Sequence, residues 1–108
     1  MDDLSSEKKA SKIECDYKFL KKLENQIQNT IDSNITNNYL GKIVQRSDNK
    51  IAQKIGEEAV EVVIEAVAKQ DKLYLEENAD LLVHMVILLN KKGYKFNDVL
   101  NIIKKRLK

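Results

Sequence analysis

The chain has 108 residues, of which 33% are charged, yet its net charge is only +2. This length fits one domain, and the balanced charge gives no general electrostatic attraction to nucleic acid or to a membrane surface. The single cysteine, Cys15, excludes an intramolecular disulfide framework and fits a reducing compartment. No apolar run approaches the roughly 20 residues of a membrane span, and the charged start does not resemble a signal peptide. We therefore expect a cytoplasmic protein.

The first part of the chain predicts one long helix followed by a short one. The sequence has no proline and three glycines, and its apolar residues recur at helical spacing. The first helix is expected to end in the stretch 32–38, because its short polar side chains compete with the helical backbone. A single helical turn is predicted near residues 39–44. The apolar stripe of the first helix consists of Ile13, Tyr17, Leu20, Leu23, Ile27 and Ile31.

Two long helices are predicted next. Asp48 is the expected N-cap of a helix that runs to about Ala68. The following helix is expected over residues 72–92, with Gly93 directly after it. Residues 81–89 are apolar nearly all round, which is typical of a central helix. The predicted core stripe of the first of these two helices is Ile51, Ile55, Ala59, Val62, Val63 and Ala66.

The last segment predicts a short helix capped by Asn97. Its basic C-terminal residues suit the helix dipole better than they suit nucleic-acid binding. The residues expected to face inward are Val99, Leu100, Ile103 and Leu107. The whole pattern predicts an all-α bundle of four to five helices with no repeat and no second domain. Because so few helices can hardly cover an apolar central helix, we expect a homodimer formed through the central helices.

Two acidic pairs stand out within the two central helices. Glu58 with Glu61, and Glu77 with Asp80, are each three residues apart, so each pair lies on one helix face. Four carboxylates that meet in an apolar setting need a cation, and their oxygens suit Mg²⁺, with Mn²⁺ as an alternative. Without further information, the competing interpretation is that these glutamates form a solvated helix face.

Three other polar positions lie close to these pairs in the sequence. Lys50 and Lys54 are one turn apart and lead toward the acidic face, so they are candidates for phosphate binding, although ion pairs with Glu58 would equally explain them. His84 follows Asp80 by one turn. A lone histidine on so apolar a helix is more often a hydrogen-bonded core residue than a catalytic one, and it can also support a metal ligand.

Two stretches resemble a known family. These are residues 50–63, KIAQKIGEEAVEVV, and residues 77–84, ENADLLVH. Through these stretches, the chain from about Phe19 onward resembles phosphoribosyl-ATP pyrophosphohydrolase of histidine biosynthesis. This family belongs to the MazG-like all-α nucleoside triphosphate pyrophosphatases. The chain departs from that pattern at residues 38–40, Asn-Tyr-Leu where Ser-Tyr-Thr is usual, and at Ser47, where glycine is common. Residues 1–15 have no counterpart and are interpreted as an extension ahead of a domain spanning 16–108.

The resemblance implies a MazG-like bundle that hydrolyses the α,β phosphoanhydride of phosphoribosyl-ATP with Mg²⁺. It implies that the metal ligands are Glu58, Glu61, Glu77 and Asp80. Glu57, about 100° around the helix from Glu58, is a catalytic candidate that would bind a second ion or orient the water. Lys50 and Lys54 would bind the substrate phosphates.

Two other functions remain open from the sequence. A house-cleaning pyrophosphatase for nucleoside triphosphates would share the metal site and differ in its base pocket. A helical dimerisation module without enzymatic activity would carry the acidic residues only as surface charges. The first expectation is a small-molecule nucleotide substrate, with no nucleic acid or membrane as partner.

Overall fold

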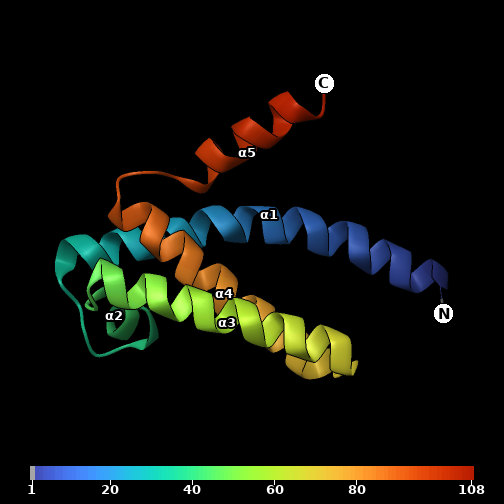
Figure 1. Cartoon of the computed structure of the whole chain (residues 1–108). Helices are drawn as coiled ribbons and strands as arrows, with labels where there is room; N and C mark the ends of the chain where they lie inside the picture. Colours follow the sequence, from blue (N-terminus) through green and yellow to red (C-terminus); the bar gives the residue numbers. More distant parts are fainter. Residues whose placement is uncertain (1) are drawn as a thin grey trace.

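The structure is a computed structural model that describes the backbone of residues 2–108 and the side chains of residues 18–108. Its described part is all-α and contains no strand. The helices are α1 (Asp2–Ser33), α2 (Tyr39–Val44), α3 (Asp48–Ala68), α4 (Asp71–Lys91) and α5 (Phe96–Arg106) (Figure 1). The predicted fold class is thereby confirmed, and the predicted turn at 39–44 is α2. None of the described helices is long and apolar enough to cross a membrane. The side chains of the predicted extension, residues 1–15, lie outside the described residues.

The centre of the fold is a hairpin made of α3 and α4, which lie side by side along most of their length (Figure 1). Helix α3 ends where Lys69 adopts a left-handed conformation, with φ of 59°. The N–H groups of Lys69 and Gln70 then bond back to the last carbonyls of the helix. Helix α1 packs against α4, and α2 contacts both of them. This arrangement holds the two helices that carry the acidic pairs in a fixed register.

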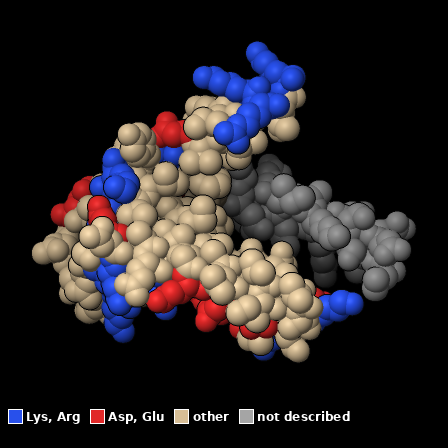
Figure 2. Space-filling model, in the orientation of Figure 1, with Lys and Arg blue, Asp and Glu red and all other residues tan. Residues whose placement is uncertain are grey.

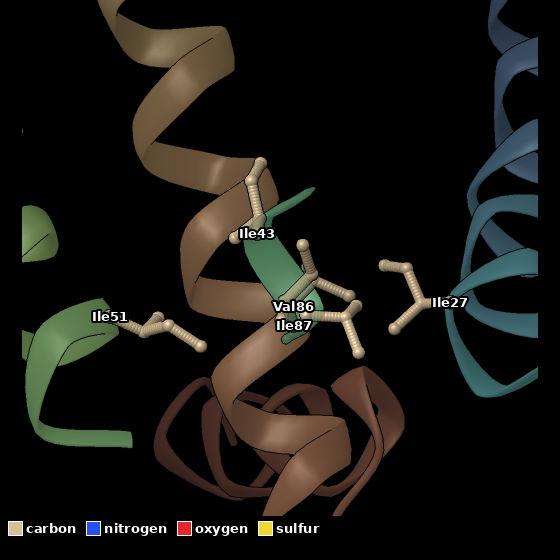
Figure 3. Close-up of a cluster of buried hydrophobic side chains, with 6 residues drawn as sticks. Ile27, Ile43, Ile51, Val86 and Ile87 are labelled. Atoms are coloured by element: carbon tan, nitrogen blue, oxygen red, sulfur yellow. The ribbon is translucent and has the colours of Figure 1, made fainter. Parts of the chain in front are cut away.

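The hydrophobic core lies at the end of the hairpin where α1, α2, α3 and α4 meet. Its buried members converge from all four helices, as Figure 3 shows. They are Ile27, Ile43, Val44, Ile51, Val86 and Ile87. The predicted stripe of α1 is confirmed for its described members, since Ile27 is buried and Leu23 and Ile31 pack against the core. The core is therefore compact and leaves the other end of the hairpin uncovered.

Helix ends agree with the expected positions within a few residues, with two corrections. Ser47, not Asp48, is the N-cap of α3, because its extended backbone lets its hydroxyl accept the Lys50 N–H at 3.1 Å. Helix α5 begins at Phe96 rather than after Asn97, because the Asp98 carboxylate accepts the Lys95 N–H at 2.8 Å. Gly93 follows α4 with φ of 88°, as predicted.

Several residues predicted to face inward are exposed in the single chain. On α3, Val63 is 61% exposed and Ala66 is also exposed, because among the described helices the main packing partner of α3 is α4, which covers one side of it. Ile103 on α5 is 44% exposed, and Leu107, directly after that helix, is 81% exposed. Helix α5 is anchored at its start, where Phe96 packs against the core, and its later turns lie apart from the hairpin (Figure 1).

Candidate active site

The two acidic pairs face each other across the α3–α4 hairpin. Each pair spans three residues on one helix, so both of its carboxylates point to the same side. The charges of Asp80 and Glu61 raise the pKa of Glu58, and the charges of Glu61, Asp80 and Glu58 raise the pKa of Glu77, so the four acids form one electrostatic group. The structure therefore brings together the four acids predicted to bind metal, just beyond the core end of the hairpin.

Glu77 is the acid whose pKa is raised most clearly, to about 7. The largest cause is a side-chain hydrogen bond with Glu61, followed by burial and then by the negative charges of Glu61, Asp80 and Glu58. Two carboxyl groups can bond to each other only when one carries a proton. The Glu61–Glu77 pair thus holds a proton near neutral pH in place of a second negative charge.

Glu58 is buried, with 6% of the residue exposed, which is unusual for a glutamate. Burial raises its pKa, and the charges of Asp80 and Glu61 raise it further, while His84 and Lys54 oppose the shift. Its Oε1 atom lies 3.1 Å from Nδ1 of His84 but accepts no well-formed hydrogen bond. A buried carboxylate with an unpartnered oxygen is costly unless a cation or a donor compensates for it.

The lysines and Glu57 differ in their relation to this acidic group. Lys54 is close enough for its charge to lower the pKa of Glu58. Lys50 is exposed in the first turn of α3, and its backbone N–H donates to the Ser47 hydroxyl. Glu57 is exposed and accepts a hydrogen bond from Gln53 Nε2 at 3.1 Å. The roles predicted for Lys50 and Glu57 remain predictions.

Tyr39 is a site residue that the candidate set did not contain. It is the first residue of α2, and its pKa is raised by burial and then by the negative charges of Asp80 and Glu58. The start of α2 therefore lies beside the acidic group. The signal that could have identified Tyr39 is its place in residues 38–40. The sequence departs from the family pattern there, and this departure leaves the substrate contacts of the stretch open.

The acidic group fits a divalent metal ion in its donor chemistry. The negative charges around Glu58 and Glu77 raise the pKa of both, and an ion bound between the carboxylates would remove this repulsion. Among the described side chains, no three acidic, histidine or cysteine groups already surround a single point as ligands.

The fold and the site together define a class of protein: all-α chains that carry two acidic pairs on a helix hairpin. The family described as Phosphoribosyl-ATP pyrophosphohydrolase matches residues 20–107, which is most of the chain. The chain therefore belongs to the phosphoribosyl-ATP pyrophosphohydrolase family.

Named relatives agree with this assignment. A phosphoribosyl-ATP pyrophosphatase of Pyrobaculum arsenaticum is 45% identical over 51 residues, which are 47% of this chain and 54% of the relative. One from Pyrobaculum aerophilum is 43% identical with the same coverage. The histidine biosynthesis bifunctional protein HisIE of Bacteroides thetaiotaomicron is 43% identical over 49 residues, 45% of this chain and 24% of that protein. The chain thus spans about half the length, or less, of the curated relatives it matches.

Proposed function

We propose that the chain hydrolyses the α,β phosphoanhydride of phosphoribosyl-ATP to phosphoribosyl-AMP and pyrophosphate, the second step of histidine biosynthesis. The observation that supports this most is the grouping of Glu58, Glu61, Glu77 and Asp80 within the segment that matches the family. A water oxygen bonds to phosphorus while the bridging P–O bond breaks, and the bridging oxygen leaves with the pyrophosphate.

In this proposal the four acids hold Mg²⁺, and Mn²⁺ is an acceptable substitute. The bound ion would neutralise phosphate charge and lower the pKa of the attacking water. Lys54, which already interacts with Glu58, supplies a positive charge for the phosphates, and Lys50 is a second candidate one turn earlier. Tyr39, whose pKa is raised by burial and by the charges of Asp80 and Glu58, would contact the substrate at the edge of the acidic group.

The direct test is pyrophosphate release from phosphoribosyl-ATP, measured beside ATP and the deoxynucleoside triphosphates. We expect turnover of phosphoribosyl-ATP that needs Mg²⁺ and stops in EDTA. Faster turnover of ordinary nucleoside triphosphates would instead support a house-cleaning pyrophosphatase. No turnover of any nucleotide, together with no stabilisation by Mg²⁺, would support a helical module without enzymatic activity.

The proposed assembly is a homodimer formed through the outer half of the α3–α4 hairpin. In a single chain this surface exposes large apolar residues, among them Val60 at 59% and Val67 at 78%. Figure 2 shows a broad uncharged surface there, beside acidic side chains. The other exposed apolar residues of the hairpin are Val63, Ile64, Leu73, Leu75, Leu82 and Met85. Contiguous apolar surface of this kind is typical of a protein interface.

We further propose that the protein works in the cytoplasm, where the intermediates of amino-acid biosynthesis are found, with a small-molecule nucleotide as its ligand. The nearly balanced net charge of +2 supports neither nucleic acid nor a membrane as partner.

A further inference from the structure

His84 joins the two helices of the site through a single buried ring nitrogen. The residue is 5% exposed, and its Nδ1 atom lies 2.8 Å from the backbone carbonyl oxygen of Asp80 and 3.1 Å from Oε1 of Glu58. One of these residues is on α4 and the other on α3. The imidazole therefore contacts two of the four proposed metal ligands, one by its main chain and one by its side chain.

These contacts determine where the ring carries its hydrogen. A backbone carbonyl and a carboxylate are both acceptors, so Nδ1 next to them must be the protonated nitrogen in either charge state of the ring. The Asp80 carbonyl oxygen is the closer acceptor and receives the Nδ1–H hydrogen bond. Glu58 Oε1 lies slightly farther from Nδ1 and has no hydrogen-bond partner among the described residues. The opposite nitrogen, Nε2, is buried and has no partner among the described residues.

We propose that His84 is a positioning residue: its Nδ1–H bonds to the Asp80 carbonyl oxygen, and the electrostatic attraction of the same group, 3.1 Å from Oε1 of Glu58, keeps that carboxylate in the arrangement that receives the metal ion. This inference rests on the proposed function. Its physical reason is preorganisation. A glutamate side chain that is already fixed loses less conformational freedom when it binds an ion. Glu58 is the buried member of the group and therefore the one that a neighbouring side chain can fix most fully.

Two variants of His84 separate positioning from simple filling of space. The amide nitrogen of asparagine can occupy the place of Nδ1, whereas the longer glutamine carries its amide to the place of Nε2. His84→Gln should therefore weaken Mn²⁺ binding, measured by calorimetry or by the spin resonance of free Mn²⁺, about ten-fold or more. His84→Asn should stay within about three-fold of the wild type. At saturating metal, both variants should regain most of the turnover.

Asn90 offers a matched control because it is also a buried polar residue of α4, 5% exposed, but bonds to Glu24 and Tyr94 rather than to the acidic group. Asn90→Leu should lower the melting temperature and leave Mn²⁺ affinity unchanged. If His84 only fills space, both His84 variants would behave like this control, and the inference would be wrong. Equal loss of Mn²⁺ affinity in His84→Asn and His84→Gln would also overturn it.

The same measurements distinguish failure of this inference from failure of the proposed function. Direct metal binding needs no turnover of phosphoribosyl-ATP. A wild-type protein that binds Mn²⁺ with an affinity unaffected by His84→Gln would overturn the positioning role alone. A wild-type protein that binds no Mn²⁺ would overturn the metal site and the positioning role together. If His84→Asn is too unstable to purify, His84→Gln is instead compared in a Glu58→Gln protein. It should cost little further Mn²⁺ affinity there, because the carboxylate that His84 positions is already absent.

Discussion

At the scale of single residues, the raised pKa of Glu77 links stability to pH. The folded protein keeps the Glu77 proton up to a pH of about 7, whereas the unfolded chain loses it near the usual value of 4.5. The stabilising effect of this proton is therefore full below the unfolded pKa and is lost as pH rises through the folded pKa. Glu58, whose pKa is also raised, acts in the same direction.

We predict that in EDTA the melting temperature falls between about pH 5 and about pH 8, and that saturating Mg²⁺ removes most of this fall. Thermal unfolding followed by circular dichroism across this range is the measurement. Glu77→Gln, which keeps the shape and cannot ionise, should flatten the profile in EDTA. A profile with the same slope in this variant would show that the Glu61–Glu77 pair is not its source.

Asp80 is expected to be indispensable for turnover, because its charge acts on Glu77, Glu58 and Tyr39. Asp80→Asn keeps the shape of the side chain and removes that charge. Turnover should fall below about a tenth of the wild-type rate, since loss of a metal ligand costs several kcal/mol of transition-state stabilisation. In EDTA the variant should melt no lower than the wild type, because one source of repulsion has gone. Asp71→Asn, at the exposed start of α4, is the control and should keep full activity.

Lys54 tests the proposed phosphate contact. Lys54→Met should raise KM or lower kcat about ten-fold, roughly 1.4 kcal/mol, while metal affinity changes little. If Lys54 is instead only an ion-pair partner of Glu58, the melting temperature would fall and the kinetic constants would stay near the wild type. Lys72→Met removes an exposed lysine from the far end of the hairpin and should change neither property.

At the scale of helices, the placement of α2 depends on a close backbone approach at Gly41. A Cβ atom added there would meet the Ile35 carbonyl oxygen, which belongs to the chain segment leading into α2. The same position is fixed by the Asn38 side chain, which accepts the Gly41 N–H at 2.8 Å. Because Tyr39 begins this helix, any shift of α2 also moves the phenol beside the acidic group.

Gly41→Ala should therefore destabilise the protein by about 1–3 kcal/mol, the usual cost of overpacking. Gly56→Ala is its matched opposite, because a Cβ atom at Gly56 meets no atom within 4 Å in the interior of α3. That substitution should stabilise by about 0.5–1 kcal/mol through better helix propensity. Chemical denaturation of both variants gives the two free energies of unfolding, and equal signs would contradict the account of α2.

At the scale of the whole molecule, the protein is expected to be a dimer, because a core of six buried apolar residues leaves the outer half of the hairpin uncovered. Val63→Asp places a charge in the proposed interface and should shift the mass measured by light scattering at micromolar concentration toward the monomer. Leu107→Asp changes a residue that is even more exposed but follows the end of α5, and should leave the mass unchanged. A wild-type protein of monomeric mass would refute the proposal.

The sequence by itself determined the local features. Helix periodicity, the polar stretch before Tyr39 and the glycine after α4 gave the helix order, because these signals act over one or two turns. The three-residue spacing likewise placed Glu58 with Glu61, and Glu77 with Asp80, on common helix faces. The resemblance in residues 50–63 and 77–84 then indicated the family that the match over residues 20–107 establishes.

Only the tertiary structure decided which residues of different helices meet. The register of α3 against α4 pairs Glu61 with Glu77 and brings His84 to Glu58. That register depends on how the core packs, a balance of many contacts that no single segment encodes. The same limit explains why Val63 was predicted to be buried. An apolar stripe shows that a surface needs covering, but it does not say whether the covering comes from the same chain.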